Sequence, residues 1–128
     1  MNVLLDTCTF LWLITDAPEL SRLAREVFED PDNSVYLSTV STWEISVKHS
    51  LGRLHLPELP ATYIPKMRIA HGIESLPLDE VSTLHLGRLP ELHRDPFDRL
   101  LVCQAIVGGL VILTPDESIL QYPVRFVW

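Results

Sequence analysis

The sequence predicts a three-layer α/β/α fold with a mainly parallel central sheet. The runs 3–5 and 110–114 are almost continuously apolar, which suits parallel strands buried on both faces. Segments with helical spacing of apolar residues lie between such runs, and this alternation favours parallel pairing through right-handed crossovers. A length of 128 residues is typical of one domain. We therefore expect residues 1–128 to form a single domain.

The first half of the chain predicts two strands, each followed by helix. A turn at 31–33 separates these two units. Ser41 and Glu44 form a Ser-x-x-Glu capping box, in which each side chain satisfies a backbone N–H at a helix start. The expected elements are a strand at 3–5, helices at 7–14 and 21–30, a strand at 35–37, and a helix beginning at Ser41.

In the second half of the chain, the spacing of apolar residues is less regular before residue 93. Three prolines lie in the segment 54–65, which predicts a loop followed by a helix that begins near Ala61 or Ile64 and ends at His71. The remaining expected elements are a strand at 73–76, a helix at 79–86, a buried helix after Asp95, a strand at 110–114, a short helix at 116–120 and a last strand at 124–127.

The helix after Asp95 is the most apolar of the predicted helices. Asp95 suits the N-cap and Pro96 suits the first helical position. The segment 100–107 leaves almost no polar face, so this helix should be buried. Gly108 and Gly109 should end it.

Charge and composition limit the function. The formal net charge is −7, whereas a protein that binds nucleic acid by neutralising phosphates is normally basic. A role in nucleic-acid chemistry therefore requires something that offsets this acidity, most simply a metal cation. Cys8 and Cys103 leave room for one disulfide but not for a disulfide framework. No signal-peptide pattern and no membrane-spanning run is evident, so we expect a cytoplasmic protein without a membrane partner.

Four acidic residues recur at one kind of position. Asp6 ends the first strand, Glu44 and Asp98 lie in the first turns of predicted helices, and Asp116 follows a later strand. Ligands of open α/β sheets bind beyond the carboxyl ends of the strands, where helix N-termini also point. The recurrence favours one shared site.

Each acid also fits a purely structural role. Glu44 could complete the capping box with Ser41, and Asp98 could do the same for Asp95. Asp116 lies in a further capping sequence that begins at Thr114. Asp6 is harder to explain in this way, because it caps a helix only if the next helix starts there.

Carboxylates that meet without partners repel one another, and a hard divalent cation resolves this. Mg²⁺ and Mn²⁺ prefer oxygen ligands and can link carboxylates to a phosphate. The chemistry that follows is hydrolysis of a phosphodiester, in which the ion lowers the pKa of the attacking water and stabilises the leaving oxygen.

Other residues carry weaker signals. The five histidines show no metal-ligand spacing, and the three tryptophans fit core or interface positions better than base stacking. Lys48 lies four residues after Glu44 and Arg99 four after Asp95, which suits helical ion pairs. Either cation is also a candidate contact for a substrate phosphate.

Four segments together resemble a PIN domain, and more narrowly the VapC-type toxins of bacterial toxin–antitoxin pairs. The resemblance covers essentially the whole chain, and it depends on the four acids in their ordered contexts. The segments, in chain order, are VLLDTCTFLW, LSTVSTWEISVK, RDPFDRLLVCQA and LVILTPDESI.

The resemblance implies a metal-dependent endoribonuclease, using Mg²⁺ or Mn²⁺, that forms a homodimer and is inhibited by an antitoxin whose tail lies across the active-site groove. Asp6 and Asp98 match metal ligands, and Glu44 and Asp116 match positions that hold metal or the activating water. Thr114 matches a supporting hydroxyl.

Asp95 is a nearby acid that fits a cap. The chain departs from the family at Pro115, where Asn is frequent, and at Cys8 and Cys103, where other small or polar residues are expected. None of these departures removes an acid.

Three alternative functions compete with the nuclease interpretation. A receiver-like signalling domain also binds Mg²⁺ beside strand-end acids, but it needs an acid pair after the first strand and a Lys-Pro near the last, where this chain has Tyr122-Pro123. A phosphatase of the DxDxT kind fails because Cys8 stands at the second aspartate position. A catalytically silent interaction protein with the PIN fold is the third hypothesis, against which the presence of all four acids argues.

Overall fold

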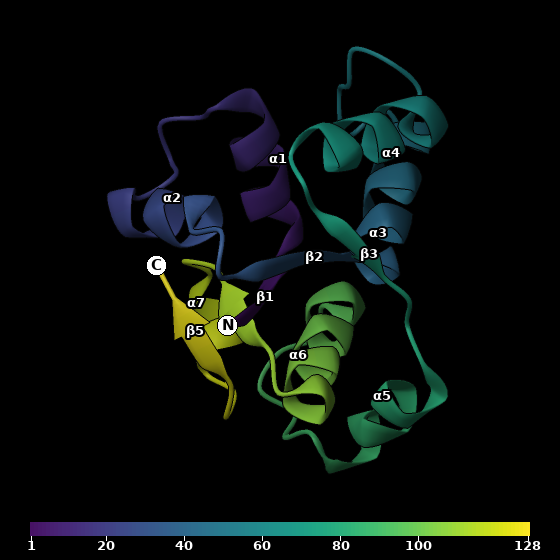
Figure 1. Cartoon of the computed structure of the whole chain (residues 1–128). Coiled ribbons are helices and arrows are strands. Elements are labelled where there is room, and N and C mark those ends of the chain that lie inside the picture. Colours follow the sequence, from purple (N-terminus) through teal and green to yellow (C-terminus); the bar gives the residue numbers. More distant parts are fainter.

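Five parallel strands form one central sheet in the computed structural model, which describes residues 1–128 (Figure 1). The strand order is β3-β2-β1-β4-β5, and all four pairings are parallel. The predicted α/β class and parallel sheet are confirmed. The strands are β1 (Asn2–Leu5), β2 (Ser34–Ser38), β3 (Glu74–Leu76), β4 (Val111–Leu113) and β5 (Arg125–Val127).

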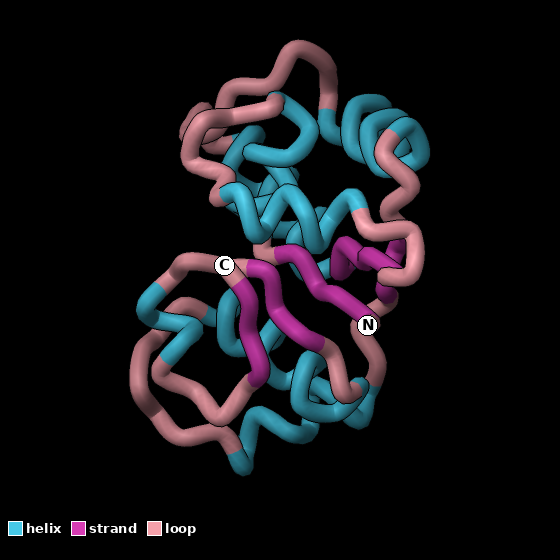
Figure 2. The backbone as a smooth tube through the Cα atoms, turned by 60° about the vertical axis from the view of Figure 1, so that its left-hand side comes forward, coloured by secondary structure: helices cyan, strands magenta, loops and turns pink.

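Helices cover both faces of the sheet, which gives the predicted three layers (Figure 2). Core contacts place α1, α2 and α4 on one face and α6 with α7 on the other. The helices are α1 (Thr7–Thr15), α2 (Arg22–Glu29), α3 (Thr39–Ser50), α4 (Pro60–Ala70), α5 (Glu80–Leu84), α6 (Pro96–Gly108) and α7 (Glu117–Leu120), with a 3₁₀ helix at His85–Arg88.

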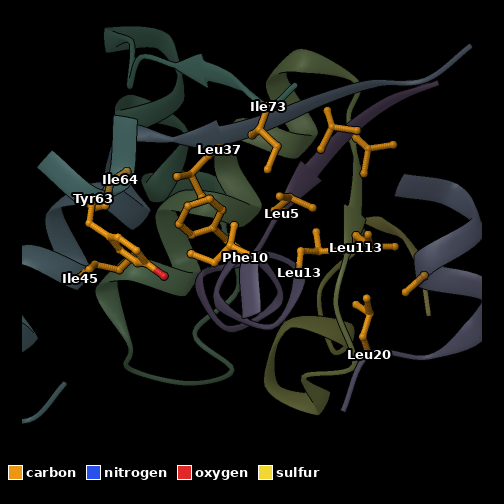
Figure 3. Packing of buried hydrophobic residues seen from close by; sticks show 14 residues of the cluster. Leu5, Phe10, Leu13, Leu20, Leu37, Ile45, Tyr63, Ile64, Ile73 and Leu113 are labelled. Carbon is orange, nitrogen blue, oxygen red and sulfur yellow. The ribbon is translucent and has the colours of Figure 1, made fainter. Parts of the chain in front are cut away.

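The two hydrophobic clusters lie on opposite faces of β1. Val3 and Leu5 belong to a cluster that also contains Phe10 of α1, and Figure 3 shows Phe10 near Leu37 and Leu5. Leu4 belongs to the second cluster, beneath α6. All three β1 leucine and valine side chains are 0% exposed, which explains why this strand is apolar without alternation.

Strand register places the candidate site. Leu5 pairs with Leu37 of β2 and with Leu113 of β4, so these three strands end at the same level. The next residues along the chain are Asp6, Ser38 (the last residue of β2) and Thr114. Polar groups therefore emerge together at the carboxyl edge of the sheet.

Three sequence predictions need correction. The Ser41–Glu44 capping box is wrong, because α3 begins at Thr39 and the Ser38 side chain accepts from the N–H of Val40 at 3.0 Å. The predicted helix start at Ala61 or Ile64 is late, because α4 begins at Pro60, where a missing N–H costs nothing at a helix start.

The third correction concerns Thr114. It is not the cap of α7; Asp116 is, and its side chain accepts from the N–H of Ser118 at 2.9 Å. No helix in the structure is both long enough and apolar enough to cross a membrane.

Replacing Ile112 by alanine should lower the free energy of unfolding by about 2–5 kcal/mol, because the side chain is 0% exposed and the cavity would lie in the hydrophobic cluster beneath α6. Urea unfolding followed by circular dichroism measures the change. The matched control is Val81→Ala on α5, where the side chain is 61% exposed and the change should stay within about 0.5 kcal/mol. Equal effects of the two substitutions would contradict this account of the core.

Candidate active site

Asp6 joins the end of β1 to the start of α1. Its Oδ1 accepts from the N–H of Thr9 at 2.7 Å, so Asp6 is the N-cap of α1, and its Oδ2 accepts from the hydroxyl of Thr114. The residue is 4% exposed. Burial raises the pKa of this carboxyl, and the hydrogen bonds from Thr114 and Thr9 partly oppose that shift.

Glu44 lies on α3 beyond its first turn, so it is not a capping residue as one sequence interpretation had it. Its Oε1 accepts from the hydroxyl of Thr7 at 2.7 Å, and its Oε2 forms an ion pair with Lys48. The same Thr7 oxygen lies 2.9 Å from the hydroxyl of Ser41. The predicted Glu44–Lys48 helical ion pair is thus present, and the hydrogen bond from Lys48 to Glu44 raises the pKa of the lysine.

Asp98 is the most perturbed acid of the site. Its N–H donates to Oδ1 of the N-cap Asp95 at 3.2 Å, which confirms Asp95 as a cap, and the Asp98 side chain is only 17% exposed. Burial, followed by the charges of four neighbouring acids, raises the pKa of Asp98 to about 7. Those four acids are Asp95, Asp116, Glu44 and Asp6, in order of effect.

Thr114 connects two of the acids. Its hydroxyl donates to Asp6 and accepts from the N–H of Asp116 at 3.0 Å. Pro115 removes a backbone N–H at the intervening position but leaves this bridge intact. A supporting role for Thr114, expected from the sequence, therefore has a geometric basis.

The acids share one edge of the sheet, but no three His, Cys, Asp or Glu side chains lie close enough together to hold a metal ion. Repulsion between the carboxylates is consistent with the distances between them. Asp6, Glu44 and Asp116 each direct carboxylate oxygens towards their own hydrogen-bond donors. Lys48, which pairs with Glu44, offsets part of the negative charge of these acids. The donor set is made of carboxylate oxygens, which fits a hard divalent cation.

Cys8 lies in the field of the same acids. Burial, followed by the charges of Asp6 and Glu44, raises the pKa of its thiol to about 11. A protonated thiol is neither a nucleophile nor a metal ligand at neutral pH. Cys8 is exposed and Cys103 is buried, and both are free, so the disulfide that composition allowed is not formed.

Sequence analysis missed the group behind Asp98. Nε2 of His93 lies 3.5 Å from Oδ2 of Asp98, and Nδ1 of the same ring lies 2.6 Å from the hydroxyl of Tyr122. Arg99 does not pair with Asp95 as expected; its guanidinium donates to the hydroxyl of Tyr122 at 3.1 Å. Tyr122 lies 29 residues from His93 and 23 residues from Arg99, and no sequence motif predicts contacts over such separations.

The tryptophans were expected at core or interface positions. Trp43 is 53% exposed and contacts Phe97 with ring centroids 4.8 Å apart, so of these two positions it is not in the core. The rings of Trp12 and Trp128 pack together with centroids 5.8 Å apart, and Trp128 also packs against the core.

An open hollow of about 460 Å³ lies beside the acids and not over them. His93 links the two regions because it borders the hollow and also contacts Asp98. Two arginines give this hollow a basic wall. Its lining residues are Glu91, Leu92, His93, Arg94 and Arg99.

Asp98→Asn should stabilise the metal-free protein at pH 7.5 by about 1–2 kcal/mol, because it removes a charge that the fold buries among other acids. The folded-state pKa of about 7 lies above the ordinary 3.8, so folding favours the protonated carboxyl. The loss of folding stability caused by ionised Asp98 is complete above pH 7 and disappears as the pH falls towards 4.

Thermal unfolding in EDTA at several pH values tests this. The stability difference between variant and wild type should shrink as the pH falls, whereas Glu19→Gln, at an exposed acid outside the site, should show little difference throughout. A destabilised Asp98→Asn protein would refute the electrostatic account.

Known proteins resemble this chain in sequence and in fold. A segment of 61 residues is 38% identical to a Mycobacterium tuberculosis protein named Ribonuclease VapC16. The segment spans 48% of this chain and 43% of that relative, so less than half of the relative's length is matched.

Two solved structures share the fold at low identity. VapBC2 from Rickettsia felis, bound to a DNA fragment from its promoter, superposes with a TM-score of 0.71 at 16% identity over 99% of this chain and 98% of the other. DNA-bound VapBC from Salmonella typhimurium gives 0.70 at 21% identity over 99% and 97%. The PIN domain family model matches residues 3–124. With that match and the strand-end acids described above, the chain belongs to the PIN domain family.

Proposed function

We propose that this protein is a metal-dependent endoribonuclease and the toxin of a type II toxin–antitoxin pair. The observation that carries the proposal is the mutual electrostatic influence of Asp6, Glu44, Asp98 and Asp116 at one edge of a PIN-domain sheet. The 38% identity to a protein named as a ribonuclease supports the same activity. The receiver-like alternative loses its basis with membership of the PIN family.

The cation is Mg²⁺ or Mn²⁺ in this proposal, held chiefly by Asp6 and Asp98, with Glu44 and Asp116 as further ligands or as holders of the attacking water. When bound, such an ion lowers the pKa of a water and neutralises charge on the leaving oxygen. It would also offset the repulsion that, after burial, raises the pKa of Asp98.

The chain's own residues prepare the reaction. Thr114 fixes Oδ2 of Asp6, and Thr7 fixes Oε1 of Glu44, so these two carboxylates keep their orientation when the substrate arrives. Lys48, whose side chain is 46% exposed, offsets the charge of Glu44 at the rim and can approach a substrate phosphate.

The basic hollow beside Asp98 can hold the RNA phosphate that neighbours the cleaved one. Arg94 is exposed there, and Arg99 forms part of the wall. Of the two substrate contacts suggested by sequence, Lys48 remains at the rim, whereas Arg99 is largely committed to Tyr122 and to backbone carbonyls. We therefore assign the main phosphate contact in the hollow to Arg94.

The proposed protein partners are a cognate antitoxin and a second copy of this chain. The solved VapBC structures of similar fold support an antitoxin partner. The decisive cellular experiment is expression of the protein alone, which should arrest growth, while the Asp6→Asn variant should not.

Purified protein should cleave single-stranded RNA in Mg²⁺ or Mn²⁺, and EDTA should abolish the cleavage. Asp6→Asn and Asp98→Asn should each lower the rate by about 100-fold or more, because each removes a charged ligand of the ion. Labelled RNA separated on denaturing gels gives the rates, and circular dichroism checks that the variants fold.

Glu19→Gln is the control, since it removes an exposed acid outside the site. Cleavage that persists in EDTA would sink the metal mechanism. Absence of cleavage on any RNA, with binding of the ion intact, would favour the catalytically silent interaction protein.

Arg94→Gln should weaken RNA binding several-fold and reduce the slope of log affinity against log salt by about 0.7, as expected for one lost phosphate contact on a single strand. Fluorescence anisotropy in the Asp6→Asn background, where RNA stays intact, measures both quantities. Arg125→Gln is the matched control. Arg125 pairs with Val111 where β4 and β5 begin, at the opposite end of the strands from the acids. An unchanged salt slope in Arg94→Gln would remove the hollow from the RNA path.

A further inference from the structure

A chain of polar contacts leads from Asp98 through His93 and Tyr122 to Arg99. Arg99 donates to the Tyr122 hydroxyl at 3.1 Å, that hydroxyl lies 2.6 Å from Nδ1 of His93, and Nε2 of His93 lies 3.5 Å from Oδ2 of Asp98. Tyr122 is 4% exposed, and the His93 side chain is 15% exposed. The contacts therefore form in a largely dry environment, where unmatched polar atoms are costly.

The first contact has only one direction. A guanidinium has donors and no acceptor, so the Tyr122 oxygen accepts from Arg99. The phenol hydrogen is then free to point at Nδ1 of His93. With Nδ1 accepting, the proton of the neutral imidazole must be on Nε2.

The second ring nitrogen of His93, Nε2, shows what the contact with Tyr122 does for Asp98. Nε2 of His93 is buried and has no hydrogen-bond partner, yet it faces a carboxylate oxygen. A lone pair on Nε2 would oppose that carboxylate, whereas an N–H directed at it attracts it. The hydroxyl of Tyr122 thus selects the tautomer that suits Asp98.

Arg99 also holds the loop that carries His93. Its guanidinium donates to the carbonyl oxygens of Pro90 and of His93, at 3.0 and 3.3 Å. The same side chain therefore fixes the backbone of the loop and the phenol that orients the ring.

We propose that His93 is a positioning residue for Asp98, held in its Nε2–H tautomer by Tyr122 and Arg99. The Nε2–H group supports Oδ2 and leaves the other oxygen of Asp98 for the divalent cation. This inference rests on the proposed function, since it assigns a role to residues behind one ligand of that cation. Groups that orient ligating carboxylates from behind change metal affinity by about 10–100-fold when they are removed.

Nitrogen-15 NMR of the imidazole at pH 8 in EDTA tests the tautomer directly. The expected signature is a protonated Nε2 and an unprotonated Nδ1 in the wild type, with loss of that preference in Tyr122→Phe. A protonated Nδ1 in the wild type would overturn the inference whatever the metal results are. This readout responds to hydrogen-bond direction and not to packing alone.

Calorimetric titration with Mn²⁺ tests the role. His93→Leu should weaken binding about 10–100-fold and Tyr122→Phe by a smaller factor. His93→Gln keeps an amide donor near the Nε2 position and should restore most of the affinity. The matched controls are His71→Leu, which removes a half-buried histidine bonded to Met67 on α4, and Tyr36→Phe on β2.

The outcomes separate this inference from the proposed function. If wild type binds Mn²⁺ and His93→Leu binds it equally well, the positioning role is refuted and the nuclease proposal stands. If wild type binds no divalent ion while Nε2 is protonated, the metal mechanism fails, and the role of His93 fails with it.

Discussion

Repulsion among carboxylates at one edge of the sheet is the constraint on which the rest of this structure depends. The paired ends of β1 and β4 bring Asp6 and Thr114 together, and α6 adds Asp98. Single hydroxyls and one lysine satisfy these acids only partly, and the pKa of Asp98 is still raised to about 7. The fold thus keeps an arrangement that costs stability, which is usual where a site serves a ligand and not the core.

Sequence patterns predicted those parts of the fold that depend on local chemistry. A strand buried on both faces must be apolar throughout, and β1 could be recognised for that reason. Asp95 followed by Pro96 located the start of α6, because both preferences come from backbone groups within one turn. The four acids were found because their positions relative to strands and helix starts could be read without knowing any tertiary contact.

Features set by long-range contacts were not predictable in the same way. Ser38 and Ser41 are both good capping residues, and the choice between them follows from the Ser38 hydroxyl, which bonds Gln104 of α6 across 66 residues. The His93–Tyr122 contact spans 29 residues and has no motif. Glu44 was assigned a first-turn position from the wrong serine, so its capping role disappeared once the helix start was known.

The thiol of Cys8 has a consequence for the chemistry of oxidation. It lies exposed among the acids, yet burial of its sulfur is the largest cause of its high pKa, with the carboxylates adding to it. Thiolates react with peroxides and disulfides, and thiols scarcely do. The high pKa keeps this thiol in its less reactive protonated form at neutral pH, so formation of a sulfenic acid or a glutathione adduct beside these acids is disfavoured.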